Sequence, residues 1–226
     1  VKQALRYSCN IFFYEVGRQL GISKMNEYFK MLGLGSKTGV ELTEATGIVA
    51  GPEERQAQGL VWYPGDTVQA AIGQADNLFT PIQLAAYVST LANGGTKYKA
   101  HFVKSIKSAD YSQTLYEAQP EVLTQYEFSR SSLQTVRDGM VMMGSSQAAF
   151  QGLPYQIAAK TGTAEAKRKV NGATVEFTNG FMISYAPADD PQIAVVIAIE
   201  NVTSGGLGNY VRDVYEAYFN SGSGVT

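Results

Sequence analysis

The sequence predicts an α+β fold in which an antiparallel sheet is packed with helices. Three extended segments follow one another toward the end of the chain, at residues 157–163, 176–185 and 192–200. A polar segment separates the first two, and a proline-rich turn separates the last two. Segments with apolar residues at three- and four-residue intervals lie before and after them, as in amphipathic helices. We therefore expect the three strands to form a meander with helices on its faces.

The first predicted helix begins at Ser8-Cys9-Asn10. Apolar residues then recur at helical spacing: Phe12, Val16 and Leu20. Serine and asparagine are common N-cap residues, so capping is the favoured interpretation of the tripeptide by itself. The chemical interpretation makes Ser8 a hydroxyl in a proton relay and Asn10 an amide donor to a substrate.

Two more helices are predicted in the middle of the chain. Thr80 and Pro81 supply an N-cap and a first-turn proline for one of them, which ends at Asn93-Gly94-Gly95. The other covers residues 131–143, and we expect its methionines to fill the core. Its apolar face is formed by Leu133, Val136, Met140 and Met143.

The segment between these helices, residues 96–128, is polar and rich in tyrosine and has no helical period. We expect an excursion that contains a hairpin. His101, the single histidine, lies in it and is predicted to be structural, because a lone histidine builds neither a metal site nor a catalytic triad. No metal or other cofactor is expected.

A last helix is predicted to pack on the meander. Its apolar stripe consists of Val211, Val214, Tyr215, Tyr218 and Phe219. Residues 221–226 are expected to form a frayed tail.

Composition favours a single domain over residues 1–226. The chain is 45% hydrophobic, and 18 basic and 20 acidic side chains give a net charge of -2. No nucleic-acid partner is implied by that balance. Cys9 is the single cysteine, which excludes an internal disulfide, and it is predicted to be a small buried residue.

The sequence contains Lys-Thr-Gly twice. Lys37-Thr38-Gly39 follows a glycine-rich, turn-forming stretch and is predicted to be a loop. Lys160-Thr161-Gly162-Thr163 lies on the first predicted strand. Strand alternation would direct Lys160 and Gly162 to one face and the two threonines to the other.

The second copy suits the binding of an extended peptide. Lys160 would attract a substrate carboxylate, and Gly162 would let a substrate backbone approach the strand. The backbone N–H of Thr163 could stabilise a developing oxyanion. The alternative is an ordinary edge strand protected by a lysine.

Lys-Thr-Gly and Ser-x-Asn are two of the motifs of penicillin-recognising serine enzymes. The third, Ser-x-x-Lys, is absent: no serine from Ser8 to Ser223 has lysine three residues later. Over most of its length the sequence resembles class B penicillin-binding proteins of the rod-elongation, or penicillin-binding protein 2, type. The segments that carry this resemblance are Thr38-Gly39-Val40-Glu41-Leu42, Glu44-Ala45-Thr46-Gly47, Trp62-Tyr63-Pro64-Gly65-Asp66-Thr67, Ala71-Ile72-Gly73-Gln74, Asn77-Leu78-Phe79-Thr80-Pro81-Ile82-Gln83-Leu84, Leu91-Ala92-Asn93-Gly94-Gly95 and residues 179–200.

The resemblance implies a β-lactamase/transpeptidase-like fold that is incomplete at its N-terminus, with the Ser-x-x-Lys helix several dozen residues upstream. Ser8, Asn10 and Lys160 would be catalytic, and Lys160, Thr161, Gly162, Thr163 and Gln74 would bind substrate. Gln74 belongs to the family's Gly-Gln-Gly loop, in which Ala75 replaces the second glycine and would be strained at a positive φ.

The function implied is that of part of an extracytoplasmic, membrane-anchored bacterial D,D-transpeptidase. It would bind peptidoglycan stem peptides and β-lactams and work with the upstream part of the same protein and a glycosyltransferase. The isolated chain is expected to be inactive. Two alternatives are a non-catalytic peptide- or partner-binding module and a relative of β-lactamases or β-lactam sensors. An unpaired strand Ile193–Ile199 would also favour a dimer.

Overall fold

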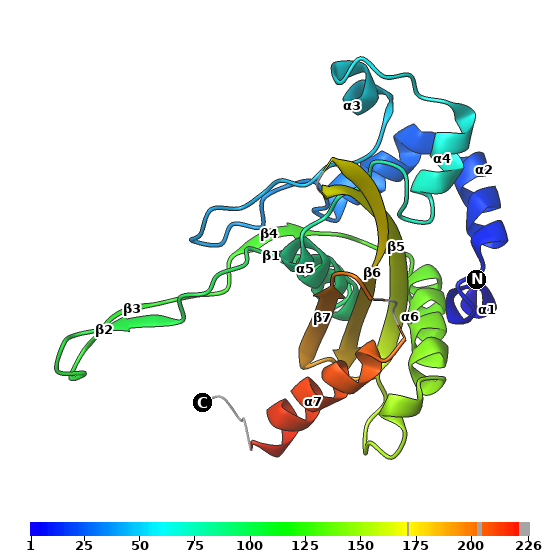
Figure 1. The fold of residues 1–226 in the computed structure, drawn as a ribbon. Helices are drawn as coiled ribbons and strands as arrows, with labels where there is room; N and C mark the ends of the chain where they lie inside the picture. Colours follow the sequence, from blue (N-terminus) through cyan, green and yellow to red (C-terminus); the bar gives the residue numbers. More distant parts are fainter. Residues whose placement is uncertain (171, 203–204, 222–226) are drawn as a thin grey trace.

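A three-stranded antiparallel sheet forms the centre of the molecule (Figure 1). The computed structural model describes residues 1–170, 172–202 and 205–221. The strands β5 (Ala158–Val170), β6 (Ala173–Ala186) and β7 (Ile193–Ile199) are hydrogen-bonded in the order β5-β6-β7. The predicted α+β meander is therefore confirmed, and β7 coincides with the apolar run expected to form it.

Helices cover both faces of this sheet. Val211 and Tyr215 of α7 (Leu207–Asn220) are buried on one face, and Val88 of α5 (Pro81–Ala92) is buried on the other. The helix whose methionines are predicted to fill the core is α6 (Arg130–Ser145), which lies along β5 (Figure 1). Met140 and Met143 are 3% and 4% exposed, which confirms that they fill the core. Val214 is the exception in the predicted stripe of α7, since it is 42% exposed.

The β5–β6 hairpin is longer than the sequence indicates. The polar connection predicted over residues 166–174 is wrong, because the strands stay paired as far as Val170 and Ala173. Lys167 and Glu176 form an ion pair of 2.6 Å across the two strands. A ribbon exposed on both faces needs no apolar alternation, so hydrophobic pattern does not reveal it.

The predicted excursion is a long arm. In Figure 1 it extends away from the sheet, with the β1–β4 pair at its base and the β2–β3 pair toward its tip. His101 lies in the arm and is exposed, with Nδ1 3.1 Å from the carbonyl oxygen of Val103. The strands of the arm are β1 (Thr96–Tyr98), β2 (Ser105–Lys107), β3 (Thr114–Glu117) and β4 (Val122–Gln125).

The start of the second helix corrects two predictions. The N-cap of α2 (Asn10–Met31) is Cys9, and no side chain caps the helix. The capping interpretation of Ser8 and Asn10 is therefore wrong. Cys9 is exposed rather than buried, because it lies on the turn that joins α2 to the preceding short helix α1 (Lys2–Arg6).

The predicted start of α5 is confirmed in detail, since Thr80 accepts a hydrogen bond from the backbone N–H of Gln83. Among the described residues, no helix has both the length and the apolar character that a membrane span requires. The expected tail lies outside the described residues from position 222 onward. The remaining helices are α3 (Pro52–Ala57), α4 (Pro64–Ala70) and the 3-10 turn η1 (Ala148–Phe150).

Candidate active site

Helix α6 determines the position of Ser8, because it packs against the short helix that precedes this residue. Helix α1 packs against α6, where Lys2 forms a 2.5 Å ion pair with Asp138. Gly139 of α6 allows this approach, since a Cβ there would lie 2.6 Å from Cδ1 of Leu5. Ser8 follows α1 with a φ of 50°, a left-handed conformation that is uncommon outside glycine. Such conformations cost free energy and are concentrated at functional sites.

The same helix fixes the start of β5. Gly144 of α6 lies so close to Ile157 that a Cβ would overlap the Ile157 carbonyl oxygen. Ala158 and Ala159 are fully buried. Lys160 follows directly, so both elements of the predicted site are anchored on α6.

The structure brings the Ser-x-Asn and Lys-Thr-Gly motifs into contact. Lys160 Nζ donates a hydrogen bond of 2.6 Å to Oγ of Ser8, which lies 152 residues away in the sequence. It donates a second, also of 2.6 Å, to the carbonyl oxygen of Thr161. Burial lowers the pKa of Lys160 below that of a solvated lysine, because a low-dielectric environment disfavours the ammonium form.

Pairing with β6 shows how the Lys-Thr-Gly strand is oriented. Lys160 is opposite Ile183, on the face covered by α5, and Thr161 is opposite Met182, in the cluster under α7. Lys160 and Gly162 therefore share one face and the two threonines the other, as the alternation predicted.

A cavity of about 560 Å³ collects the predicted site residues. It is lined by Ser8, Asn10, Gln74, Lys160, Thr161, Gly162 and Thr163. Sequence reasoning missed Tyr14, Gln69, Ile72 and Glu165, which line it too. Two of them could have been found by periodicity, since Tyr14 lies one helical turn after Asn10 and Glu165 two strand positions after Thr163.

A second cavity, of about 470 Å³, lies behind Lys160. Apart from the motif residues, its wall is mainly apolar, and it includes Phe13, Phe29, Leu32, Phe79, Leu84 and Ile183. It extends between α2, α5 and the sheet.

The Gln74 loop, residues 71–77, approaches β5 from the side. Gln74 Nε2 lies 3.4 Å from the carbonyl oxygen of Thr163. Ala75 adopts a φ of 59°, so the loop keeps a left-handed residue at the position where the family usually has glycine. Gly73 is also left-handed, with a φ of 81°.

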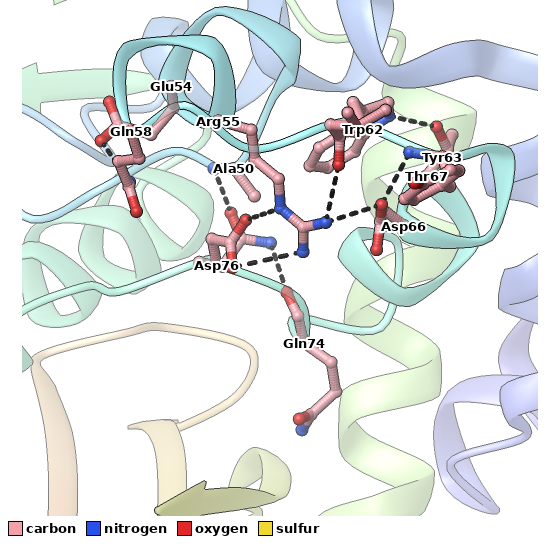
Figure 2. Close-up of polar contacts among 12 residues, drawn as sticks. Ala50, Glu54, Arg55, Gln58, Trp62, Tyr63, Asp66, Thr67, Gln74 and Asp76 are labelled. Atoms are coloured by element: carbon pink, nitrogen blue, oxygen red, sulfur yellow. Dashed lines mark hydrogen bonds and ion pairs between the residues drawn. The ribbon is translucent and has the colours of Figure 1, made fainter.

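A charged cluster lies beside this loop, and Figure 2 draws it above Gln74. Arg55 of α3 forms ion pairs with Asp66 at 2.9 Å and Asp76 at 2.5 Å. Asp66 also accepts a hydrogen bond of 2.7 Å from the backbone N–H of Tyr63, at the start of α4. The Arg55 guanidinium lies 5.4 Å from the centre of the Trp62 ring. The hydrogen bond that Arg55 donates to Asp76 is the main reason why the pKa of Arg55 is raised.

The other Lys-Thr-Gly triplet is a loop, as predicted. Glu44 accepts hydrogen bonds from the backbone N–H and the hydroxyl of Thr38 and from the N–H of Gly39, at 2.7 to 2.9 Å. Lys37 is exposed, whereas Thr38 is 4% exposed. No group of three or more His, Cys, Asp or Glu side chains that could hold a metal occurs in the part of the chain that the structure describes.

The fold and the contact between the Ser-x-Asn and Lys-Thr-Gly motifs are typical of the class of penicillin-recognising serine enzymes. The profile of the family described as "Penicillin binding protein transpeptidase domain" matches residues 1–218, and the chain belongs to this family. Solved structures of similar fold match a comparable share of the chain.

The peptidoglycan D,D-transpeptidase MrdA of Acinetobacter baumannii is 31% identical over 216 residues, which cover 90% of this chain and 32% of that protein. A solved structure described as "Structural coordination of polymerization and crosslinking by a peptidoglycan synthase complex" has a TM-score of 0.80 at 31% identity, over 97% of this chain and 37% of that one. A ceftriaxone acyl-enzyme of penicillin-binding protein A from M. tuberculosis also has a TM-score of 0.80, at 26% identity, over 96% of this chain and 47% of that one. The chain thus spans about a third of the curated relative's length.

Proposed function

We propose that this chain is the C-terminal portion of the catalytic domain of an extracytoplasmic D,D-transpeptidase that cross-links peptidoglycan. The observation that carries the proposal is the 2.6 Å hydrogen bond from Lys160 to Ser8, beside a cavity that Asn10 also lines. Family membership supports the same activity. In this proposal the nucleophilic serine and its activating lysine belong to the protein's sequence before Val1.

The reaction proceeds in two acyl transfers. The upstream serine Oγ forms a bond to the penultimate D-Ala carbonyl carbon of a stem peptide, and the amide bond to the terminal D-Ala breaks. The serine proton passes to the leaving amine, and Ser8, bonded to Lys160, lies on that route. An amine of a second stem peptide then displaces the serine and forms the cross-link.

The remaining residues hold the donor peptide. Lys160 supplies positive charge for the terminal carboxylate, and Thr161 and Thr163 line the same cavity. Gly162 leaves room for the peptide backbone, since the nearest side-chain atom to a Cβ there would be Phe181 Cβ at 3.6 Å. Asn10 and Gln74 also line the cavity and offer amide groups to the donor peptide. β-Lactams would react as mimics of the donor.

The apolar cavity behind Lys160 supports an upstream helix as the missing part of the site. Aromatic and aliphatic side chains line it directly beside Ser8 and Lys160, where an amphipathic helix could bury its apolar face and present a serine. Without that helix, the isolated chain would bind but not form an acyl-enzyme.

Labelling with a fluorescent penicillin tests the proposal. The full-length protein should be labelled covalently, and the isolated chain should not. Labelling of the isolated chain would place the nucleophile within it and overturn the assignment. An unlabelled full-length protein would favour a binding module instead, and rapid hydrolysis of the acyl group would favour a β-lactamase.

Membrane anchoring and partners form part of the same proposal. The similarity to a peptidoglycan synthase complex that coordinates polymerization and crosslinking supports a glycosyltransferase as partner. Among the described residues, β7 is an edge strand of the sheet. Its outer edge could therefore pair with a strand from the upstream part of the protein or from a second copy. A monomer in gel filtration of the isolated chain would exclude the dimer.

A further inference from the structure

We propose that Arg55 is a positioning residue for the transpeptidase site, because it fixes the Gln74 loop through Asp76 and thereby presents the Gln74 amide beside Thr163. The functional readout of this inference rests on the proposed function. Its structural part, the immobilisation of the loop by Arg55, does not.

The loop needs an external anchor. Its two left-handed residues, Gly73 and Ala75, flank Gln74, and the alanine holds this conformation against the steric repulsion of its Cβ. The contact between Gln74 and the Thr163 carbonyl oxygen is long, at 3.4 Å, and exposed. One hydrogen bond of that length contributes too little to impose a strained loop on the strand.

Arg55 supplies that anchor directly after the strained residue. Its Nε donates to one oxygen of Asp76 at 2.5 Å, and its Nη2 lies 3.4 Å from the other. Its Nη1 donates to Asp66 at 2.9 Å and to the Val61 carbonyl oxygen at 3.2 Å. The Arg55 side chain is 18% exposed, so these bonds are partly shielded from water.

The cluster therefore joins three separate pieces of backbone (Figure 2). Arg55 comes from α3, Asp66 from the first turn of α4, and Asp76 from the loop. Asn77 completes the attachment, since its side-chain NH₂ donates to the Gln74 carbonyl oxygen at 3.2 Å and its Oδ1 accepts from the Ala50 N–H at 3.0 Å. A planar guanidinium is required here, because a lysine ammonium cannot serve both carboxylates with the same fixed geometry.

The test uses the full-length protein and a double-mutant cycle. Arg55→Lys should lower the second-order rate constant of acylation by a fluorescent penicillin about tenfold. The reason is that displacing the Gln74 amide by about 1 Å removes it from its catalytic geometry. In a Gln74→Ala background the same substitution should change that constant by less than about twofold, since the residue acts through Gln74. Asp76→Asn should reproduce both results. Arg212→Lys is the matched control, as Arg212 also bonds a carboxylate and two carbonyl oxygens, but on α7.

Two results would overturn the proposal. In the first, the effects of Arg55→Lys and Gln74→Ala on the acylation rate multiply in the double mutant. In the second, the Arg55→Lys protein is acylated at the same rate as the unaltered protein. Hydrogen exchange separates it from a failure of the proposed function. In Arg55→Lys, amides of residues 71–77 should exchange about tenfold faster, while those of β5 to β7 stay unchanged. If the unaltered protein is not labelled, this local result still decides the role of Arg55; uniform acceleration or none would refute it.

Discussion

The two Lys-Thr-Gly triplets of this chain have the same side chains in opposite settings. The first lies in a loop, where Thr38 is buried and Glu44 accepts hydrogen bonds from its backbone and hydroxyl. The second lies on β5, where Lys160 reaches Ser8 and the strand borders a cavity. A short motif thus has no fixed meaning. Its role depends on which of its groups the local backbone leaves facing a cavity.

The difference also appears in the charges. The first triplet surrounds a carboxylate with N–H and O–H donors, an arrangement that stabilises a turn. In the second, the ammonium of Lys160 bonds two neutral oxygen atoms and is partly desolvated. Its positive charge therefore remains available for an anionic ligand, at a cost to folding.

The largest expected difference between the triplets is in acylation. Lys160→Ala in the full-length protein should abolish labelling by fluorescent penicillin, a loss of about 10³-fold or more, because it removes both the carboxylate-binding charge and the Ser8 contact. Lys37→Ala should leave the labelling rate unchanged, since Lys37 is exposed in a loop. Equal effects of the two substitutions would refute the assignment of the site to β5.

Much of the fold around the two triplets could be predicted from the sequence. The apolar run of β7 and the Thr80-Pro81 helix start produce local signals that the structure confirms. The β5–β6 extension could not be found from hydrophobic pattern, because its described side chains face solvent on both sides. The left-handed conformation of Ser8 could not be predicted either. It depends on the packing of α1 against α6, which fixes the path of the chain into α2, whose N-cap is Cys9.

The next effect is on stability, at the first triplet. Glu44→Gln should lower the free energy of unfolding by about 2 kcal/mol, because a carboxamide cannot accept all three hydrogen bonds and its NH₂ opposes a backbone donor. Urea unfolding of the chain measures it. The acylation rate of the full-length protein should stay unchanged, and a reduced rate would indicate that this loop contributes to the site.

A smaller effect separates the two glycines. Gly39 has a φ of 98°, and a Cβ there would lie 2.7 Å from Cγ of Lys99, so Gly39→Ala should cost about 1 kcal/mol of stability. Gly162 is not left-handed, and its Cβ would make an ordinary 3.6 Å contact with Phe181. Gly162→Ala should therefore keep the stability and slow acylation, because the methyl group obstructs the peptide. Unfolding curves and labelling rates measure both variants. A loss of stability in Gly162→Ala, together with slower acylation in Gly39→Ala, would contradict these roles.

The Arg55 cluster shows where sequence reasoning ends. Arg55 is separated from Asp66 by 11 residues and from Asp76 by 21, and it belongs to a helix of six residues. Neither periodicity nor a short motif connects charges at such spacings. Their association follows from the path of the backbone around Trp62 and α4, which tertiary packing determines.

The smallest expected difference lies in the pH dependence of stability. At both triplets stability rises with pH, but in different pH ranges and for different physical reasons. Burial acts to raise the pKa of Glu44, but the hydrogen bonds from Thr38 and Gly39 outweigh it, and the pKa lies below the usual value. The stabilisation by Glu44 should thus be complete above its unfolded pKa of about 4.3 and be lost as the pH falls through the folded value.

The pKa of Lys160 is also lowered, but here the cause is burial, which disfavours the charged form of the side chain. The folded chain then binds fewer protons than the unfolded chain between the folded pKa and the unfolded value of about 10.4. Stability contributed by this residue should therefore rise with pH across that window, by at most about 1.4 kcal/mol per pH unit. Lys160→Met should reduce the rise, while Lys37→Met, at an exposed lysine, should leave it in place. A smaller rise should remain in Lys160→Met, because burial also lowers the pKa of Lys97. Urea unfolding of the three proteins between pH 7 and 10.5 measures the slopes. A slope in Lys160→Met equal to that of the unaltered protein would assign the whole rise to other groups.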